Sequence, residues 1–297
     1  MGFFRYLRRN IPLAIGLFIL VVLTAFTTIG QFYIDDEVEP YPLGAPARVA
    51  PTLAYCPLTE PDCENPIALP FGTDSQGRNL FAVAVAGTWL TIRIGVLAGV
   101  IGVLVGTILG FTSAYYGGQF DAIVRWMVDV LLTIPGLLIL VVISSAVGAE
   151  TLDPTRMAMI IALLAWMGPT RVIRAQVLSM RERSYVMMAR LNGMSNMGII
   201  VKEMIPNLLP YLGASLVASV TGAIFASIGL SALGLGDLRA PALGNTIFWA
   251  MNQGAMLNGL WWWLAVPVVI IIFIFVMLFM ISAGLDELAN PRVRRSA

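Results

Sequence analysis

Few residues of this chain could carry acid–base, metal or nucleophilic chemistry. Its 297 residues include no histidine, two cysteines and one lysine, Lys202. Histidine is the commonest metal ligand and a frequent general base, so its absence weakens both chemistries. A phosphate-binding loop needs Gly-Lys followed by Ser or Thr, whereas Lys202 is followed by Glu203. The sequence therefore predicts no catalytic residue, no metal site and no cofactor or ATP site in this chain.

Both cysteines, Cys56 and Cys63, lie in a polar segment at residues 31–80 that also holds eight acidic residues and eight prolines. Proline at that density opposes both helix and sheet, so we expect an irregular lobe rather than an enzyme domain. Disulfides persist outside cells, which favours a Cys56–Cys63 bridge, with two free thiols as the alternative. The acidic lobe either docks a partner or is only solvated.

The elements that position these residues are apolar helices. The chain is 58% hydrophobic and 12% charged, against about 25% charged residues in soluble domains. Crossing a bilayer takes about 20 apolar residues. Six segments qualify as spans: residues 11–30, 88–114, 122–148, 157–173, 207–232 and 261–283. A secretory signal is the alternative for the first, but its apolar run is long and no A-x-A site follows, which favours an uncleaved anchor.

Basic residues divide unevenly between the two sides that six spans define. Thirteen of the 18 lie on one set of segments: Arg5, Arg8, Arg9, Arg125, Arg171, Arg174, Arg181, Arg183, Arg190, Lys202, Arg292, Arg294 and Arg295. The positive-inside rule makes that set cytoplasmic. We therefore expect an all-α integral membrane protein with six transmembrane helices and both termini cytoplasmic. Its regions are residues 1–30, an external lobe at 31–87, and a transmembrane core at 88–297 with a cytoplasmic loop at 180–206.

Five glycines recur along the second span at spacings of 4, 3, 4 and 4 residues. They are Gly95, Gly99, Gly102, Gly106 and Gly110. This spacing places them near one helical face, and a face of small residues lets another backbone approach closely. Ordinary glycine enrichment of membrane helices is the alternative. The register favours close helix packing, against a helix of this chain or of another.

Charges at membrane depth are few. Arg93 lies near the outer end of the second span, where it can snorkel outward, and Asp129 lies early in the third. A central charge costs about 3 kcal/mol on insertion scales. Two charged groups near helix ends are too few to form a proton relay across the membrane. Asp129 either binds substrate or, as we expect, makes a structural bond between helices near the cytoplasmic face.

Two external segments carry helix signals. In FGTDSQGRNLF, residues 71–81, Thr73 and Asp74 are expected to cap a helix at the outer surface. TIFWAMNQGAM, residues 246–256, is expected to form a short external helix. Three tryptophans at 261–263 follow it, as is typical of an interfacial belt.

The cytoplasmic loop has its own helix signals. Residues 182–192 suit a short helix, and Gly193 suits its C-terminal cap, where a left-handed residue is needed. Ser195 can cap a second helix, and Pro206 marks the return to the membrane.

Soft apolar side chains are spread along this loop at Met187, Met188, Leu191, Met194 and Met197. Methionine suits a surface that repacks against a moving partner. Packing back onto the bundle is the alternative, and the residues alone leave both interpretations open.

The loop resembles the EAA-x3-G-x9-I-x-L-P signature of permease subunits from binding-protein-dependent, ATP-driven importers. The corresponding positions are Met187, Met188, Ala189, Gly193, Glu203, Ile205 and Pro206. Met187 replaces the signature's glutamate, so no contact by that glutamate carries over. FGTDSQGRNLF, SAYYGGQFDAIVRWMVDVLLTIPGLLI, LSALGLG and LDELANPRVRR resemble motifs of C-type permeases in the dipeptide, oligopeptide and nickel subfamily, across nearly all of residues 70–295.

The resemblance implies a multi-pass subunit of the plasma (inner) membrane that is not itself an enzyme. It implies a heterodimer with a second permease subunit, two ATPase subunits that bind ATP and Mg, an extracytoplasmic substrate-binding protein, and no nucleic acid. The loop would then seat in a groove of one ATPase and couple hydrolysis to transport. The expected contact residues are Tyr185, Met188, Ala189, Arg190, Gly193, Met194 and Ser195.

The first substrate that the resemblance implies is a di- or oligopeptide. Nickel, glutathione and oligosaccharides are alternatives within the same importer class. A stand-alone secondary transporter is the competing class, and it would want ionisable groups and broken helices near the bilayer midplane. Asp129 and Pro135 give that class little support.

Overall fold

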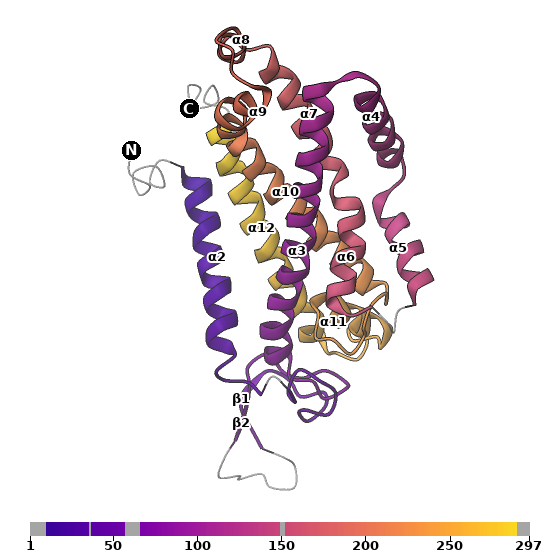
Figure 1. Ribbon diagram of the computed structural model, residues 1–297. Helices are drawn as coiled ribbons and strands as arrows, with labels where there is room; N and C mark the ends of the chain where they lie inside the picture. Colours follow the sequence, from indigo (N-terminus) through magenta and orange to yellow (C-terminus); the bar gives the residue numbers. More distant parts are fainter. Residues whose placement is uncertain (1–9, 36, 57–65, 149–151, 290–297) are drawn as a thin grey trace.

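The computed structural model describes residues 10–35, 37–56, 66–148 and 152–289. Within these ranges the chain is a helical bundle with one short two-stranded sheet (Figure 1). The helices are α2 (Ile11–Gly30), α3 (Leu80–Tyr116), α4 (Gly118–Thr133), α5 (Gly136–Val147), α6 (Pro154–Ala165), α7 (Met167–Arg181), α8 (Ser184–Leu191), α9 (Asn196–Ile199), α10 (Ile205–Ala232), α11 (Leu243–Asn252) and α12 (Trp261–Ala289). A π-helical turn, Ile200–Met204, joins α9 to α10.

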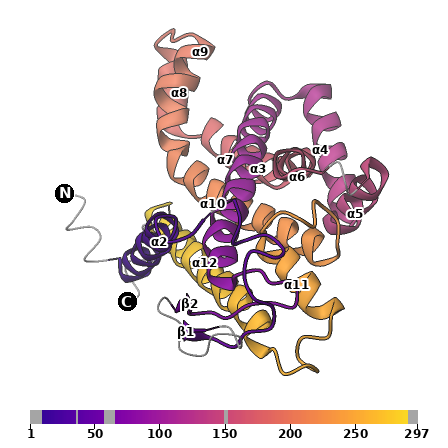
Figure 2. The ribbon, with the colours of Figure 1, turned by 90° about the horizontal axis from the view of Figure 1, so that it is seen from below.

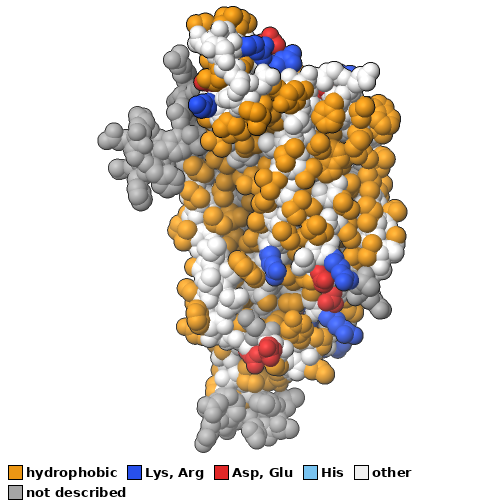
Figure 3. Space-filling model, viewed as in Figure 1, with side chains coloured by type: hydrophobic (Ala, Val, Ile, Leu, Met, Phe, Trp, Pro, Cys, Tyr) orange, Lys and Arg blue, Asp and Glu red, His pale blue; other side chains and the backbone are white. Residues whose placement is uncertain are grey.

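The bundle has two ends of different make-up (Figure 1). At the first, called the α8 end, lie α8 and α9 together with the start of α2 and the last turns of α12. At the second, called the α11 end, lie α11 and both strands. Hydrophobic side chains cover most of the face between them, and only a few charged side chains interrupt it (Figure 3). Such a surface suits a lipid environment rather than water.

Five helical segments in the described ranges are long and apolar enough to cross a membrane, or six if one bent pair is a single span. Five predicted spans each overlap one of these segments, which are Ile11–Gly30, Leu80–Tyr116, Pro154–Arg181, Asn196–Ala232 and Trp261–Leu285. The second is much longer than predicted, at 37 residues.

The third predicted span, 122–148, is not one continuous helix. It divides into α4 and α5, which meet at an 85° bend. Pro135 lies in the break, where its ring and missing N–H prevent the helix from continuing. Because of the bend, α4 packs against α3 and α7, whereas α5 packs against α6 and α10.

Helix α3 runs through the middle of the bundle, with α2 and α12 to one side and α4, α5 and α6 to the other (Figure 2). The glycine row lies on its packed faces. A methyl group added to Gly99 would lie 2.6 Å from Val220 of α10, and one added to Gly106 would lie 2.7 Å from the carbonyl oxygen of Trp166. Gly95 faces α10 as well, while Gly102 and Gly110 face α6 and α7. The five glycines therefore allow close packing against helices of this same chain.

The first half of helix α2 packs on α12, and its last residue, Gly30, packs on Val85 of α3. The side-chain amide of Asn10 donates to the carbonyl oxygen of Gly284 at 2.9 Å, which fixes the start of α2 near the far end of α12. Gly16 and Gly284 sit where the two backbones come closest, against Ile281 and Leu13. The first span is thus packed on the last, and only one of its sides is covered.

The segment predicted to form an external lobe is more ordered than expected. Strands β1 (Thr52–Tyr55) and β2 (Ile67–Leu69) form an antiparallel pair, which the prediction of an irregular lobe missed. Cys56 directly follows β1 and is disulfide-bonded, while Cys63 lies outside the described residues. The Cys56–Cys63 pairing therefore stays a prediction.

The expected helix cap at Thr73 and Asp74 was wrong. The helix begins at Leu80 and is capped by Asn79, whose side-chain oxygen accepts from the N–H of Phe81 at 3.0 Å. Asp74 instead closes a turn by accepting from the N–H groups of Gln76 and Arg78 at 2.8 and 2.9 Å. The short external helix expected at 246–256 is confirmed in part by α11, which starts and ends earlier.

Candidate functional site

Helix α8 ends in a glycine cap at the predicted residue. The N–H of Gly193 donates to the carbonyl oxygen of Arg190, and the N–H of Met194 donates to that of Ala189, both at 3.1 Å. These two bonds form a Schellman motif, which needs a left-handed residue at the position of Gly193. Its φ is +74°, a conformation that costs little only for glycine.

A continuous helical path leads from this cap into the membrane. The hydroxyl of Ser195 accepts from the N–H of Gly198 at 3.2 Å and so caps α9, as predicted. Helix α9 then passes through the π turn into α10 without an intervening loop. The side chain of Asn207 donates to the carbonyl oxygen of Glu203 at 2.7 Å, which satisfies that backbone acceptor across the junction.

One face of α8 is anchored to the bundle. Val186 is fully buried and Ala189 nearly so, in a cluster that includes Phe111 and Tyr115 of α3, Ile173 and Val177 of α7, and Leu208 of α10. Tyr185 and Met194 pack partly buried against the same cluster. Burial raises the pKa of the Tyr185 phenol above its usual value. The hydroxyl of Tyr115 donates to the side-chain oxygen of Asn196 at 3.0 Å, which ties α9 to α3.

The other face of the loop carries apolar side chains away from the bundle. Met187, Met188, Leu191 and Met197 are 54%, 59%, 77% and 63% exposed, and Arg190 lies exposed among them. These five residues are called the outward face. The methionines were expected either to form a partner surface or to pack on the bundle, and each interpretation describes part of the loop. Met194 packs against the bundle, whereas Met187, Met188 and Met197 are exposed.

The seven predicted contact residues divide between the two faces. Met188, Arg190, Gly193 and Ser195 are exposed, Tyr185 and Met194 are half-buried, and Ala189 is buried against the bundle. A buried Ala189 has no surface to offer a partner in this conformation. Met187, Leu191 and Met197 were not among the predicted contact residues, although they are exposed on the same face. Val186 and Ala189 are three residues apart and therefore share one face of the helix. Had that face been recognised as the buried one, the exposed face would have followed from it.

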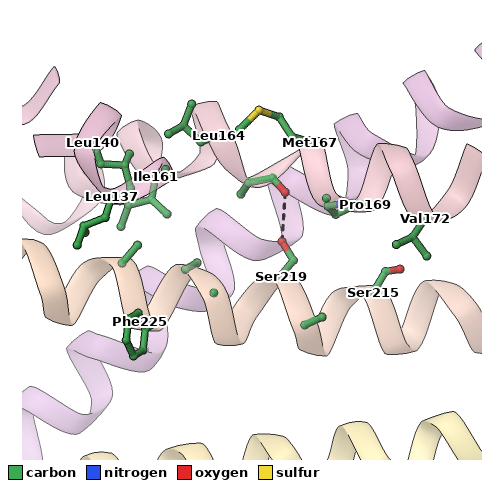
Figure 4. A pocket seen from close by; sticks show the side chains of 17 residues that line it. Leu137, Leu140, Ile161, Leu164, Met167, Pro169, Val172, Ser215, Ser219 and Phe225 are labelled. Atoms are coloured by element: carbon green, nitrogen blue, oxygen red, sulfur yellow. Dashed lines mark hydrogen bonds between the residues drawn. The ribbon is translucent and has the colours of Figure 1, made fainter. Parts of the chain in front are cut away.

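A cavity of about 450 Å³ lies between α5, α6, α7 and α10. Apolar side chains line most of it, among them Leu137, Leu140, Ile161, Leu164, Met167, Pro169, Val172 and Phe225 (Figure 4). Ser215 and Ser219 supply its hydroxyls, and that of Ser219 donates to the carbonyl oxygen of Ala165 at 3.5 Å. Within the described ranges no charged side chain lines it. Sequence reasoning did not identify this cavity, whose wall depends on the break at Pro135.

The charges near the α8 end are arranged differently from the prediction. Arg174 of α7 donates through Nε and Nη2 to the two carboxylate oxygens of Asp121 in α4, at 2.6 and 2.7 Å. Asp129 is exposed and makes neither a hydrogen bond nor an ion pair with any residue that the structure describes. The bond between helices that was expected for Asp129 is therefore made by Asp121, two helical turns earlier.

The turn at Thr73–Asn79 joins the segment before α3 to the bundle. The indole N–H of Trp262 in α12 donates to the carbonyl oxygen of Thr73 at 3.1 Å, and the hydroxyl of Ser75 donates to Gln253 at 2.5 Å. Asp74 and Arg78 form a buried ion pair at 2.5 Å inside the turn. No cluster of three His, Cys, Asp or Glu side chains in the described part of the chain is placed to hold a metal ion.

Comparison with known proteins matches this architecture to transport permeases. The sequence profile of the family described as "Binding-protein-dependent transport system inner membrane component" matches residues 102–295. The dipeptide transport system permease protein DppC of Bacillus subtilis (strain 168) is 30% identical, over 98% of this chain and 85% of its own length. The oligopeptide transport system permease protein OppC of Lactococcus lactis subsp. cremoris (strain SK11) is 30% identical, over 74% of each chain.

A solved chain of the MetNI methionine ABC transporter, in an inward-facing conformation, has a similar fold. Its TM-score is 0.53 at 16% identity, covering 70% of this chain and 94% of that one, a likeness that shows the fold alone. The helical bundle, the profile match over residues 102–295 and the alignment with DppC over 98% of this chain agree. This chain belongs to the family of inner membrane components of binding-protein-dependent transport systems.

Proposed function

We propose that this chain is one permease subunit of an ATP-driven importer that takes up di- or oligopeptides. The observation that carries the proposal is the α8 loop, whose outward face is apolar and whose helical path continues into the cavity-lining helix α10. The peptide substrate is drawn from the names of the two relatives, a dipeptide and an oligopeptide permease.

The α8 end is the cytoplasmic end in this proposal. Arg181, Arg183, Arg190 and Lys202 all lie on or next to the α8 loop. Basic residues near short loops favour the cytoplasmic side, so the rule orients the bundle with α11 and the strands outside. Residues Arg5, Arg8, Arg9, Arg292, Arg294 and Arg295, which carry the same signal, lie outside the described residues.

Separate ATPase subunits supply the energy. One of them binds the outward face, and ATP with Mg binds to the ATPases rather than to this chain. Closing and opening of the ATPase pair then displaces the α8 loop. Because α9, the π turn and α10 are joined without a flexible linker, that displacement reaches the cavity wall. Packed helices switch between discrete arrangements rather than bending continuously, so the displacement alternates the access of the cavity.

A second permease subunit and an extracytoplasmic binding protein complete the assembly. The cavity has an open side among α5, α6, α7 and α10, and the related partner subunit closes the path there. The binding protein delivers substrate to the α11 end, where the last residues of α11, Met251 and Asn252, are exposed. Apolar walls with two hydroxyls favour an organic substrate such as a peptide over a bare metal cation.

The competing class, a secondary transporter, has one supporting feature. Its expected broken helix exists at Pro135. It also needs ionisable groups near the substrate, and the described lining of the cavity contains none. The ATP-driven importer therefore accounts for more of the structure.

The experiment is co-purification from native membranes, comparing the natural chain with Leu191→Asp. We expect the natural chain to recover ATPase subunits and to support ATP-driven peptide uptake in proteoliposomes. A carboxylate at Leu191 places a charge in an apolar contact and should abolish recovery of the ATPase. Leu257→Asp is the matched control, because Leu257 is 94% exposed near the α11 end.

Two results would oppose the proposal. If Leu191→Asp recovered as much ATPase as the natural chain, the outward face would not be the docking surface. Solute uptake by the purified chain without ATP would instead favour the secondary transporter.

A further inference from the structure

A second, smaller cavity of about 170 Å³ lies between α4 and α7, toward the α8 end. Its lining is unusually basic for a cavity beside a membrane span. The seven lining residues are Val124, Arg125, Val128, Asp129, Thr170, Arg171 and Arg174. These side chains belong neither to the α8 loop nor to the lining of the 450 Å³ cavity.

The three arginines are not equivalent. Arg174 is engaged by both carboxylate oxygens of Asp121. Arg125 and Arg171 are exposed and make no hydrogen bond or ion pair with any described residue. Asp129 is likewise unpaired and faces the same cavity. Two guanidinium groups and one carboxylate, each without a hydrogen bond in the described part of the chain, thus converge on one hollow. Asp121 also attracts Arg125, and Asp129 attracts Arg174, but three arginines face two carboxylates, so positive charge remains in surplus.

The surroundings of the cavity indicate a lipid boundary. Next to the polar stripe of α4, formed by Asp121, Arg125 and Asp129 at successive turns, the helix exposes Ile123, Trp126, Met127 and Val130. Large apolar side chains beside unpaired arginines match the two halves of a phospholipid, with acyl chains along the helix and a charged headgroup at the cavity.

We propose that this cavity binds the headgroup of an anionic phospholipid from the cytoplasmic leaflet, such as phosphatidylglycerol. The guanidinium groups of Arg125 and Arg171 hold the phosphate, whose oxygens match the fork of arginine donors. The carboxylate of Asp129 accepts a hydrogen bond from a headgroup hydroxyl. Basic pockets between membrane helices on the cytoplasmic side suit such headgroups. The assignment rests on the orientation given in the proposed function.

The test is native mass spectrometry of the assembled transporter after exposure to phosphatidylglycerol or phosphatidylcholine. We expect preferential retention of phosphatidylglycerol, and Arg125→Gln with Arg171→Gln should weaken it about 30-fold, the scale for two arginines at an anionic surface. Arg93→Gln with Arg239→Gln is the matched control, because it removes the same charge far from this cavity and should retain the lipid. Asp129→Asn should weaken the retention of phosphatidylglycerol more than that of phosphatidic acid, which lacks the headgroup glycerol and its alcohol hydroxyls.

Four results would overturn the assignment. The first two are equal retention of the two lipids and unchanged retention in the R125Q/R171Q variant. The third is displacement of the lipid by inorganic phosphate alone. The fourth is that a photo-cross-linker at position 171 attaches to the second permease rather than to lipid. The readout needs no transport. Failure of the docking test with intact lipid retention would therefore count against the proposed function alone, and the reverse pattern against the lipid site alone.

Discussion

Arg174 and Asp121 form a two-pronged ion pair that joins α7 to the start of the broken span. The two hydrogen bonds measure 2.6 and 2.7 Å, and each side chain is only 19% exposed. The residues are 53 positions apart in the sequence. Because α4 is separated from α5 by an 85° bend, this pair is a main polar restraint on the position of α4.

Asp121→Asn should destabilise the protein by about 1.5–3 kcal/mol, the scale of a hydrogen bond to a charged group. Removing the charge leaves Arg174 without its counter-ion in a mostly buried site. The measurement is the thermal unfolding midpoint in lipid-free detergent. Asp129→Asn is the control and should change stability by less than about 0.5 kcal/mol. Equal losses in the two variants would show that the ion pair is not the cause.

Gly106→Ala should destabilise the bundle by about 1–3 kcal/mol through overpacking. Its new methyl group would meet the backbone of α7, at 2.7 Å from the Trp166 carbonyl oxygen and 2.9 Å from the Thr170 nitrogen. A backbone cannot swing aside as a side chain can. Gly222→Ala on α10, where no atom lies within 4 Å of the added carbon, should be tolerated. Thermal unfolding of both variants decides, and a tolerated Gly106→Ala would contradict close packing of α3 on α7.

Asp74→Ala should destabilise the turn at Thr73–Asn79 by about 3–5 kcal/mol, because Arg78 would remain buried without a counter-ion. The double variant Asp74→Leu with Arg78→Met removes both charges and should recover part of that loss. Limited proteolysis of the lobe together with thermal unfolding measures the effect. Equal stability of the single and double variants would mean that the unpaired charge is not what costs stability.

Gly193→Pro should uncouple ATP hydrolysis from import while the protein still inserts in the membrane. Proline fixes φ near −65°, against +74° here, and it has no N–H to donate to Arg190. Gly193→Asn is the control, since asparagine tolerates a left-handed backbone better than most residues. The measurement is ATPase activity and peptide uptake in the same proteoliposomes. Normal uptake with proline would show that the cap does not hold the loop in its working shape.

The spans were predictable because length and composition alone specify them. Residues 11–30 and 261–283 need no tertiary information, and helices occupy both. The caps at Gly193 and Ser195 were predictable for a similar reason, since each depends on its nearest neighbours in sequence. Local physics therefore recovered the helices and the outline of the loop.

The remaining features depend on partners far along the chain. Asp121 and Asp129 look alike in sequence, and only the position of Arg174 decides which of them forms a bond. The bend at Pro135 turns a single span into two helices and creates a cavity wall. The orientation of α8 is set because Val186 and Ala189 pack in the same buried cluster as Tyr115 and Val177. None of these choices can be read from a window of neighbouring residues.

The π turn at Ile200–Met204 can convert a small change in hydrogen bonding into a rotation of the loop relative to α10. A π turn holds one residue more than an α turn in its hydrogen-bonded ring. Each residue of an α-helix advances the chain by about 100° around the axis. Conversion of this single turn to α geometry would therefore rotate everything before it, α8 included, by roughly that angle. A large swing at the loop would then require only a one-residue change in hydrogen bonding at the membrane surface.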